Sequence, residues 1–227
     1  MAFPDLGLRV RDVQDRIDAA QMRGGHGQTV RLIAVTKTHG PDAVDAAAAC
    51  GVADVGENKV QEVLDKMQVV AAAVRWHFIG HLQRNKTKAA PHFALIHSLD
   101  SVRLADALQA AAAQHDRVQD VLVQVNVAGE EQKSGVAPAE VEALAAYIAG
   151  LPSLRVTGVM CMAPYTDDEV TLRHAFSGAR AALGTVRAAG HGEAHELSMG
   201  MSNDYEVAVE EGATLVRLGT VLFGARN

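Results

Sequence analysis

The chain is poor in cysteine, in aromatic side chains and in long uncharged apolar runs. Its 227 residues contain two cysteines, Cys50 and Cys161, and aromatic residues make up 4% of the total. Two cysteines provide no disulfide framework, which argues against a small secreted domain held together by disulfides. The first residues, Met-Ala-Phe-Pro-Asp-Leu, do not form a basic segment followed by an apolar one, so we expect no secretory signal. A reduced, cytoplasmic protein is therefore expected.

A surplus of positive charge is also missing. The formal net charge is −6, from 21 basic and 27 acidic residues, which argues against nucleic acid as a partner. No run of 18 uncharged apolar residues occurs, so we expect no membrane span. No linker or low-complexity segment divides the sequence, and its length suffices for one large core. We therefore expect residues 1–227 to form a single domain.

What the sequence does contain is a repeated order of short apolar segment, loop and helix. The expected strands are residues 31–37, 54–57, 76–79, 95–99, 121–127, 156–162, 196–199 and 214–218. The expected helices between them are residues 41–50, 58–73, 101–114, 138–149, 167–188 and 203–211. A further helix precedes them all and carries on one face Leu6, Val10, Val13 and Ile17.

Eight strands that alternate with helices predict an α/β protein, a single (β/α)8 TIM barrel with an extra N-terminal helix. A doubly wound open sheet has the same alternation and is the alternative fold. In a barrel the carboxyl ends of all strands meet on one face, and active sites of this architecture lie there. The strand ends are therefore where functional residues are expected.

Lys37 ends the first expected strand, and Gly40-Pro41 stops that strand. A lysine in this position either extends its ammonium to solvent or has a partner or a chemical role, because burying an unpaired charge is costly. Desolvation lowers the pKa of a lysine, which lets its amine attack a carbonyl and form a Schiff base. The other lysines fall on expected helices or polar loops: Lys59, Lys66, Lys86, Lys88 and Lys133.

The loops after the seventh and eighth strands form the second candidate feature, because these loops are the usual phosphate site of a TIM barrel. Ser202 and Asn203 precede an expected helix, whose first N–H groups would face an anion. Gly219 allows a backbone N–H to approach a phosphate closely, and Thr220 adds a hydroxyl. Simple helix capping by Ser202 and a simple turn at Gly219 are the alternatives.

Arg217 lies inside the last expected strand and needs an acceptor, since arginine does not lose its charge in proteins. Glu57 is one candidate acceptor, and a ligand phosphate or ring nitrogen is the other. A lysine, phosphate loops and a strand-borne arginine on one barrel face together suggest pyridoxal phosphate. The aldehyde would then bond to Lys37, and Arg217 would approach the pyridine nitrogen and weaken the ring as an electron sink.

Two weaker signals concern Asn58 and a histidine pair. Asn58 begins an expected helix with Gln61 three residues on, close to a capping-box pattern, which is compatible with a cofactor contact as well. His191 and His195 are four residues apart, but Gly190 and Gly192 disfavour the helix that a metal-binding pair at this spacing needs. We expect no metal site.

Several stretches closely resemble the pyridoxal phosphate homeostasis protein family, and the resemblance covers nearly the whole chain in order. The stretches are Ile33-Ala34-Val35-Thr36-Lys37, Gly56-Glu57-Asn58 with Gln61-Glu62, Trp76 to Lys86, Gly158-Val159-Met160 and Leu197 to Ser202. The resemblance implies a barrel like the N-terminal barrel of alanine racemase, with Lys37 as the Schiff-base lysine. The cofactor-binding residues expected from the motifs and from this resemblance are Lys37, Asn58, Met199, Ser202, Arg217, Gly219 and Thr220.

The resemblance also implies a protein that holds pyridoxal phosphate reversibly and buffers or delivers it within the cell, without strong catalysis of its own. The expected partners are pyridoxal phosphate and the apo forms of enzymes that use it, and the expected state is a monomer or weak dimer. An amino-acid racemase is the alternative function. It needs a second acid/base opposite Lys37, and the tyrosines show no sign of that role. We also expect no all-β domain like that of alanine racemase. A Schiff-base aldolase without cofactor is a third possibility.

Overall fold

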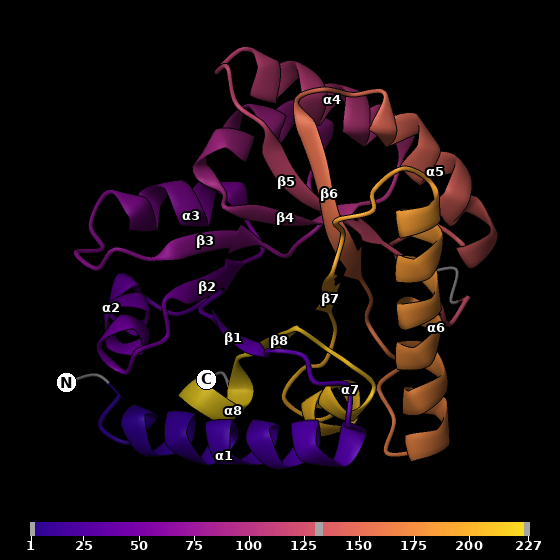
Figure 1. The fold of residues 1–227 in the computed structure, drawn as a ribbon. Helices are drawn as coiled ribbons and strands as arrows, with labels where there is room; N and C mark the ends of the chain where they lie inside the picture. The colour runs from indigo at the N-terminus through magenta and orange to yellow at the C-terminus, as the bar shows by residue number, and fades with distance from the viewer. Residues whose placement is uncertain (1–2, 130–133, 225–227) are drawn as a thin grey trace.

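Eight parallel strands close into a barrel in chain order, and β1 pairs with β8 to complete the ring. The computed structural model describes residues 3–129 and 134–224, and Figure 1 shows the strands at its centre with the helices outside them. The strands are β1 (Arg31–Val35), β2 (Asp54–Glu57), β3 (Arg75–Phe78), β4 (Leu95–Leu99), β5 (Gln119–Gln124), β6 (Leu154–Met160), β7 (Glu196–Ser198) and β8 (Leu215–Leu218). The barrel prediction is confirmed, and the open-sheet alternative is wrong.

The helices follow the expected alternation. They are α1 (Leu6–Gly24), α2 (Pro41–Ala49), α3 (Val60–Met67), α4 (Val102–Ala113), α5 (Val141–Ala149), α6 (Glu169–Ala188), α7 (Tyr205–Glu210) and α8 (Thr220–Phe223), with two 3₁₀ segments, η1 (Arg84–His92) and η2 (Pro138–Glu140). The extra helix α1 lies along the lower edge of Figure 1, where it packs against α7 and α8. No helix within residues 3–129 and 134–224 has both the length and the apolar character needed to cross a membrane.

The first strand is shorter than predicted, so Lys37 lies in a turn at the carboxyl end of the barrel and not in the strand. The prediction of strand structure to Lys37 is wrong, because β1 ends at Val35 and Lys37 lies in the turn that follows. The Thr36 N–H still donates to the Gly56 carbonyl oxygen at 3.2 Å, but Thr38 then adopts a φ of +69°. A left-handed residue cannot continue a strand, so the chain turns at the carboxyl end of the barrel.

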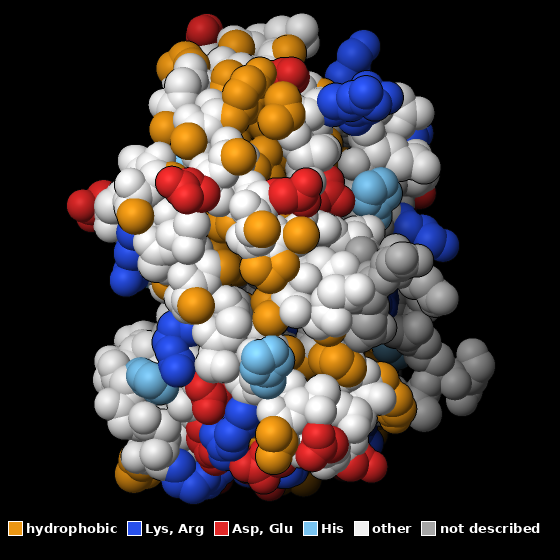
Figure 2. Space-filling model, turned by 90° about the vertical axis from the view of Figure 1, so that its right-hand side faces the viewer, with side chains coloured by type: hydrophobic (Ala, Val, Ile, Leu, Met, Phe, Trp, Pro, Cys, Tyr) orange, Lys and Arg blue, Asp and Glu red, His pale blue; other side chains and the backbone are white. Residues whose placement is uncertain are grey.

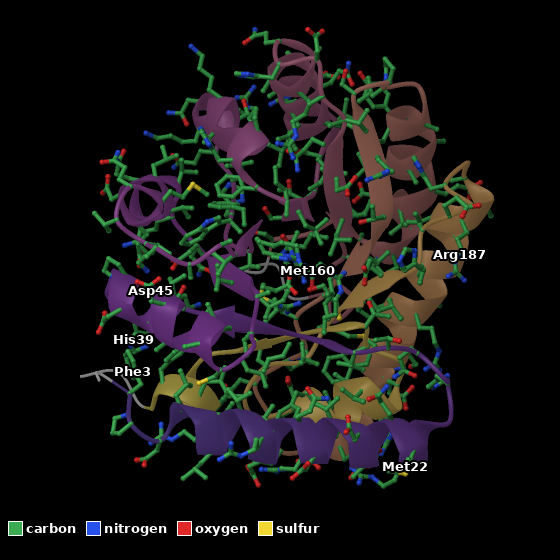
Figure 3. The ribbon with its side chains drawn as sticks, turned by 60° about the vertical axis from the view of Figure 1, so that its left-hand side comes forward. Phe3, Met22, His39, Asp45, Met160 and Arg187 are labelled. Carbon is green, nitrogen blue, oxygen red and sulfur yellow. The ribbon has the colours of Figure 1, made fainter. Side chains whose placement is uncertain are left out.

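Apolar packing is divided unequally between the two sides of the strands. A small inner cluster fills part of the barrel and consists of Ile33, Leu95, Leu122, Met160 and Leu215. Figure 3 shows Met160 near the middle of the molecule. The main cluster lies between the strands and the helices, and helix α6 contributes its predicted stripe of Leu172, Phe176, Ala179, Leu183 and Val186. The helices are therefore held on the barrel by the larger of two cores.

Ion pairs join α1, α6 and α7 on the outer surface. Arg173 contacts Glu169 and Glu210, and Arg23 contacts Glu210 at 2.5 Å. Acidic and basic side chains are interleaved in this way at the lower end of the face in Figure 2. Because these side chains are partly exposed, each pair stabilises the fold by less than about 1 kcal/mol.

Candidate functional site

A cavity of about 290 Å³ opens at the carboxyl ends of the strands. This volume is at the lower limit of ligand cavities, which range over roughly 300–1,000 Å³, so the cavity suits a small molecule. Its lining includes six of the seven predicted site residues, namely Lys37, Asn58, Ser202, Arg217, Gly219 and Thr220. The barrel thus brings together residues that lie more than 180 positions apart in the sequence.

Met199 is the seventh predicted residue, and the structure places it elsewhere. Its side chain is fully buried in the main core between the strands and the helices, and it does not line the cavity. Neighbouring strand residues face opposite sides of a sheet, so Ser198 faces the barrel interior whereas Met199 faces the helices. The Met199 side chain is therefore not available to a ligand in this cavity.

Lys37 occupies a turn that is fixed on both sides. The His39 N–H donates to the Thr36 carbonyl oxygen at 3.1 Å, which closes the turn around Lys37. Thr38, the next residue, has a φ of +69°, which is strained for a β-branched side chain. The Thr38 N–H is held by the Glu62 carboxylate at 2.7 Å. The side chain of Lys37 is half-buried and lines the cavity.

Lys66 supports this turn from the outside, a role that sequence reasoning missed. Its side chain is 5% exposed, although it was expected to be an ordinary helix lysine. Its ammonium donates to the Thr36 carbonyl oxygen at 2.8 Å, to Glu57 at 2.6 Å and to Glu62 at 2.8 Å. Burial raises the pKa of Glu57, although hydrogen bonds from Lys66 and Thr36 oppose the shift. The spacing of Glu62 and Lys66, four residues apart on a helix, was the available signal.

Arg217 reaches the cavity from inside the barrel. Its guanidinium donates to the Ser198 hydroxyl at 2.6 Å and to the Cys161 carbonyl oxygen at 2.9 Å, and both acceptors are neutral. Of the two candidate acceptors, Glu57 does not pair with Arg217, because Glu57 faces Lys66 on the outside of the barrel. Burial lowers the pKa of Arg217, but a guanidinium stays charged in proteins.

The loops after β7 and β8 meet at the cavity. The Ser202 hydroxyl accepts a hydrogen bond from the Val221 N–H at 3.3 Å, which ties one loop to the other. Capping of helix α7 by Ser202 or Asn203 is not observed, because α7 begins at Tyr205 and Asp204 is its N-cap residue. The Asp204 carboxylate accepts from the Met201 N–H at 2.6 Å, and burial raises its pKa.

Asn58 precedes helix α3 and does not cap it. The helix begins at Val60, its N-cap residue is Lys59, and no side chain caps it, so the capping-box prediction is wrong. The Asn58 backbone packs closely against Gly80, where a Cβ atom would lie 2.3 Å from the Asn58 carbonyl oxygen. Gly80 is therefore required for Asn58 to occupy its place at the cavity.

Further residues complete the cavity wall, among them His39 and Tyr165. His39 packs against Phe3 and Phe223, with ring centroids 5.9 and 5.1 Å away, and Figure 3 shows Phe3 beside His39. Tyr165 is 92% exposed at the cavity edge. Within the described part of the chain, no group of three or more His, Cys, Asp or Glu residues is placed to hold a metal ion.

Comparisons with known proteins agree on one group of relatives. A family model described as the alanine racemase N-terminal domain matches residues 11–227. A pyridoxal phosphate homeostasis protein of Aquifex aeolicus is 42% identical over 222 residues, covering 96% of this chain and 97% of that protein. The structure of PipY from Synechococcus elongatus with pyridoxal phosphate bound is 32% identical, with a TM-score of 0.85, and the match covers 96% of this chain and 100% of that one.

Alanine racemase itself is a more distant match. The enzyme of Corynebacterium glutamicum has a TM-score of 0.72 at 18% identity, and the match covers 93% of this chain and 61% of that chain. At this identity the likeness concerns the fold alone.

Proposed function

We propose a function from one premise: the chain belongs to the alanine racemase N-terminal domain family and, within it, to the pyridoxal phosphate homeostasis proteins. On this premise the chain binds pyridoxal phosphate and takes part in its homeostasis within the cell. It holds the cofactor reversibly on Lys37 and buffers or delivers it. The PipY structure, which holds the same cofactor on the same fold, supports this assignment.

The cavity fits this cofactor in charge and in size. A phosphate ester with a pyridine ring needs cations and hydrogen-bond donors, and Lys37 and Arg217 supply positive charge to the wall. The observation that carries the proposal is the buried guanidinium of Arg217, whose two acceptors, Ser198 and Cys161, are both neutral. The Asp204 carboxylate acts on this guanidinium electrostatically, and because burying a cation is costly, an additional acceptor from a ligand would lower the free energy of this site further.

Each wall residue has a role in this proposal. When bound, the cofactor supplies an aldehyde that an amine can attack, and Lys37 is the amine on the cavity wall. Arg217 would donate to the ring nitrogen and would keep it unprotonated. Ser202, Gly219 and Thr220 would hold the phosphate, and Asn58 would contact the cofactor from the cavity wall.

Further proposals concern the state of the chain. We propose that residues 1–227 form one domain, that the protein is a monomer or weak dimer, and that its compartment is the cytoplasm. The two free cysteines support a reduced compartment. The cavity edge carries the exposed residues Tyr165, Asn203 and Thr220, so the mouth faces solvent. This access supports transfer of the cofactor to the apo forms of enzymes that use it.

Borohydride reduction tests the assignment of Lys37. The protein is incubated with pyridoxal phosphate, reduced, digested and mapped by mass spectrometry. We expect the pyridoxyl group on Lys37 alone, and no labelling of that peptide after Lys37→Ala. Lys59→Ala is the matched control, since Lys59 is exposed beside the same barrel face and its loss should leave labelling unchanged. Labelling spread over Lys59, Lys66 and Lys88, or no labelling, would contradict the proposal.

A cellular test addresses homeostasis. In a strain that lacks the protein, the wild-type chain should restore normal pools of pyridoxal phosphate and amino acids, whereas Lys37→Ala should not. Equal restoration by both chains would show that the Schiff base is not needed for the cellular role.

A further inference from the structure

A line of buried polar side chains crosses the barrel interior from Arg217 to Asp54. The Arg217 guanidinium lies 2.6 Å from the Ser198 hydroxyl, which lies 2.8 Å from His97 Nδ1. His97 Nε2 is 3.0 Å from His77 Nδ1, and His77 Nε2 is 2.8 Å from the Asp54 carboxylate. All five residues are at most 5% exposed. They connect the cavity end of the barrel with its opposite end, since Asp54 is the first residue of β2.

One arrangement of protons satisfies every group along this line. The Asp54 carboxylate accepts from His77 Nε2, and His77 Nδ1 accepts from His97 Nε2. His97 Nδ1 then accepts from the Ser198 hydroxyl, whose oxygen accepts from Arg217, because arginine can only donate. In this arrangement every bond points the same way, away from Arg217.

The two ends of the line carry opposite charges, positive on Arg217 and negative on Asp54. Asp54 is also held by Arg75, whose Nε donates to it at 2.7 Å. Burial would raise the pKa of Asp54, but hydrogen bonds from His77 and Arg75 outweigh burial and hold the pKa well below its usual range. Burial, with the nearby His77, Arg217 and Arg31, lowers the pKa of His97 well below its usual value, so its ring stays neutral.

We propose that Ser198, His97 and His77 are positioning residues that hold the Arg217 guanidinium toward the ring nitrogen of the bound cofactor. Aligned hydrogen bonds polarise one another, so the negative charge of Asp54 acts on Arg217 through the groups between them, in addition to the direct electrostatic effect of Asp204. The Ser198 oxygen also fixes one of the two terminal nitrogens of Arg217, and the Cys161 carbonyl oxygen fixes the other. The guanidinium plane is thereby set, and its remaining N–H groups have one orientation.

This inference rests on the proposed function, and a pair of serine variants tests it. Ser198→Ala removes the acceptor of Arg217. Ser98→Ala is the matched control, because Ser98 is equally buried and its hydroxyl has no hydrogen-bond partner within the described residues. Two ligands are compared by fluorescence titration: pyridoxal phosphate, and its analogue in which a C–H group replaces the ring nitrogen.

We expect Ser198→Ala to weaken the binding of pyridoxal phosphate about tenfold, the effect of misplacing one charge-assisted hydrogen bond. The affinity for the analogue should change by less than about twofold, because the analogue offers Arg217 no acceptor. Ser98→Ala should bind both ligands like the wild type. The visible absorption band of the bound cofactor should shift in Ser198→Ala only, since that band depends on the hydrogen bonding of the ring.

A pair of histidine variants keeps the proposal testable if Ser198→Ala does not fold. In His97→Gln one acceptor and one donor remain at a similar separation, so pyridoxal phosphate should bind nearly as in the wild type. His97→Leu removes the hydrogen bonds to Ser198 and His77, so the affinity for pyridoxal phosphate should fall as in Ser198→Ala. Circular dichroism checks the fold of each variant.

Two results would overturn the inference while leaving the proposed function intact. One is wild-type binding of pyridoxal phosphate by Ser198→Ala and His97→Leu. The other is an equal loss of affinity for both ligands, which would mean that this line of side chains only stabilises the barrel. A wild-type chain that binds no pyridoxal phosphate would instead refute the proposed function, and the inference with it.

Discussion

The ammonium of Lys66 lies 2.8 Å from the carbonyl oxygen of Thr36, the residue immediately before Lys37. Lys66, on the outer helix α3, thus holds the backbone beside Lys37, which lines the cavity. The same ammonium neutralises the buried Glu57, and Glu62 completes the group by binding the Thr38 N–H. Helix α3 and the turn after β1 therefore form one rigid unit, from which two stability predictions follow.

Lys66→Met should lower the free energy of unfolding by about 3–5 kcal/mol, because the Glu57 carboxylate then remains buried without its cation. Urea denaturation at neutral pH measures the loss. Lys59→Met is the control, since Lys59 is exposed and its replacement should change the free energy by less than about 0.5 kcal/mol. A loss below about 1 kcal/mol in Lys66→Met would show that the ion group does not stabilise the turn.

Thr38→Gly should raise the free energy of unfolding by about 0.5–1 kcal/mol. Glycine adopts the φ of +69° without the cost that a β-branched side chain pays there, and this gain exceeds the greater chain entropy of unfolded glycine. Asp116→Gly is the comparison, because Asp116 also has a positive φ, of +48°, but aspartate tolerates it. Thermal unfolding of both variants checks this difference. Destabilisation by Thr38→Gly would mean that Thr38 is not strained.

The stability of the chain should depend on Asp54 in acid. Hydrogen bonds from His77 and Arg75 overcome the effect of burial and lower the folded-state pKa of Asp54, so its contribution is present above its unfolded pKa of about 3.9. That contribution is lost as the pH falls from about 5 through 3.9 toward the lower folded-state pKa. Asp54→Asn should remove this part of the pH dependence. Denaturant titrations at pH 5 and pH 3 should show a smaller difference in unfolding free energy for Asp54→Asn than for the wild type, and an unchanged difference would contradict the assignment.

Alanine racemisation should be weak or undetectable. Two-base racemisation needs an acid/base held opposite Lys37, and an exposed side chain is not held in this way. Tyr165, on the cavity edge, is 92% exposed. Tyr205 is 2% exposed and lies in the main core. Tyr147 donates a hydrogen bond to Asp106 between two outer helices. Chiral chromatography after incubation with L-alanine and cofactor measures the product. Sustained turnover that Tyr165→Phe abolishes would restore the racemase alternative.

The sequence was sufficient for the barrel because its signals are local and repeated. Each strand is a short apolar run followed by a turn signal, and helix α6 carries a stripe whose members, from Leu172 to Val186, are all buried. Strand β2 and strand β4 have the predicted bounds, and the other strands differ from prediction by one to three residues at an end. Element ends are set by individual hydrogen bonds, such as the turn at Thr38, which periodicity does not contain.

Contacts between side chains of different strands and helices could not be predicted from the sequence. Glu57 was one of two candidate acceptors for Arg217, but strand alternation turns Glu57 outward. The distance between two strands of a ring cannot be found without its geometry. Lys66 reaches inward because its long side chain spans the gap between helix and strand. A usable signal existed for His77 and His97, since each is a histidine that directly follows an apolar residue within a strand.

The unequal division of the two apolar cores has a consequence for how this fold can change. The helices are fastened to the outside of the strands by the main cluster, while the inner cluster has only Ile33, Leu95, Leu122, Met160 and Leu215. Folding therefore depends mainly on the outer layer, and the lumen is free to hold polar side chains. Substitutions of residues inside the barrel can therefore change which ligand it binds while the outer core keeps the fold stable. Proteins with the same barrel can in this way come to bind different ligands.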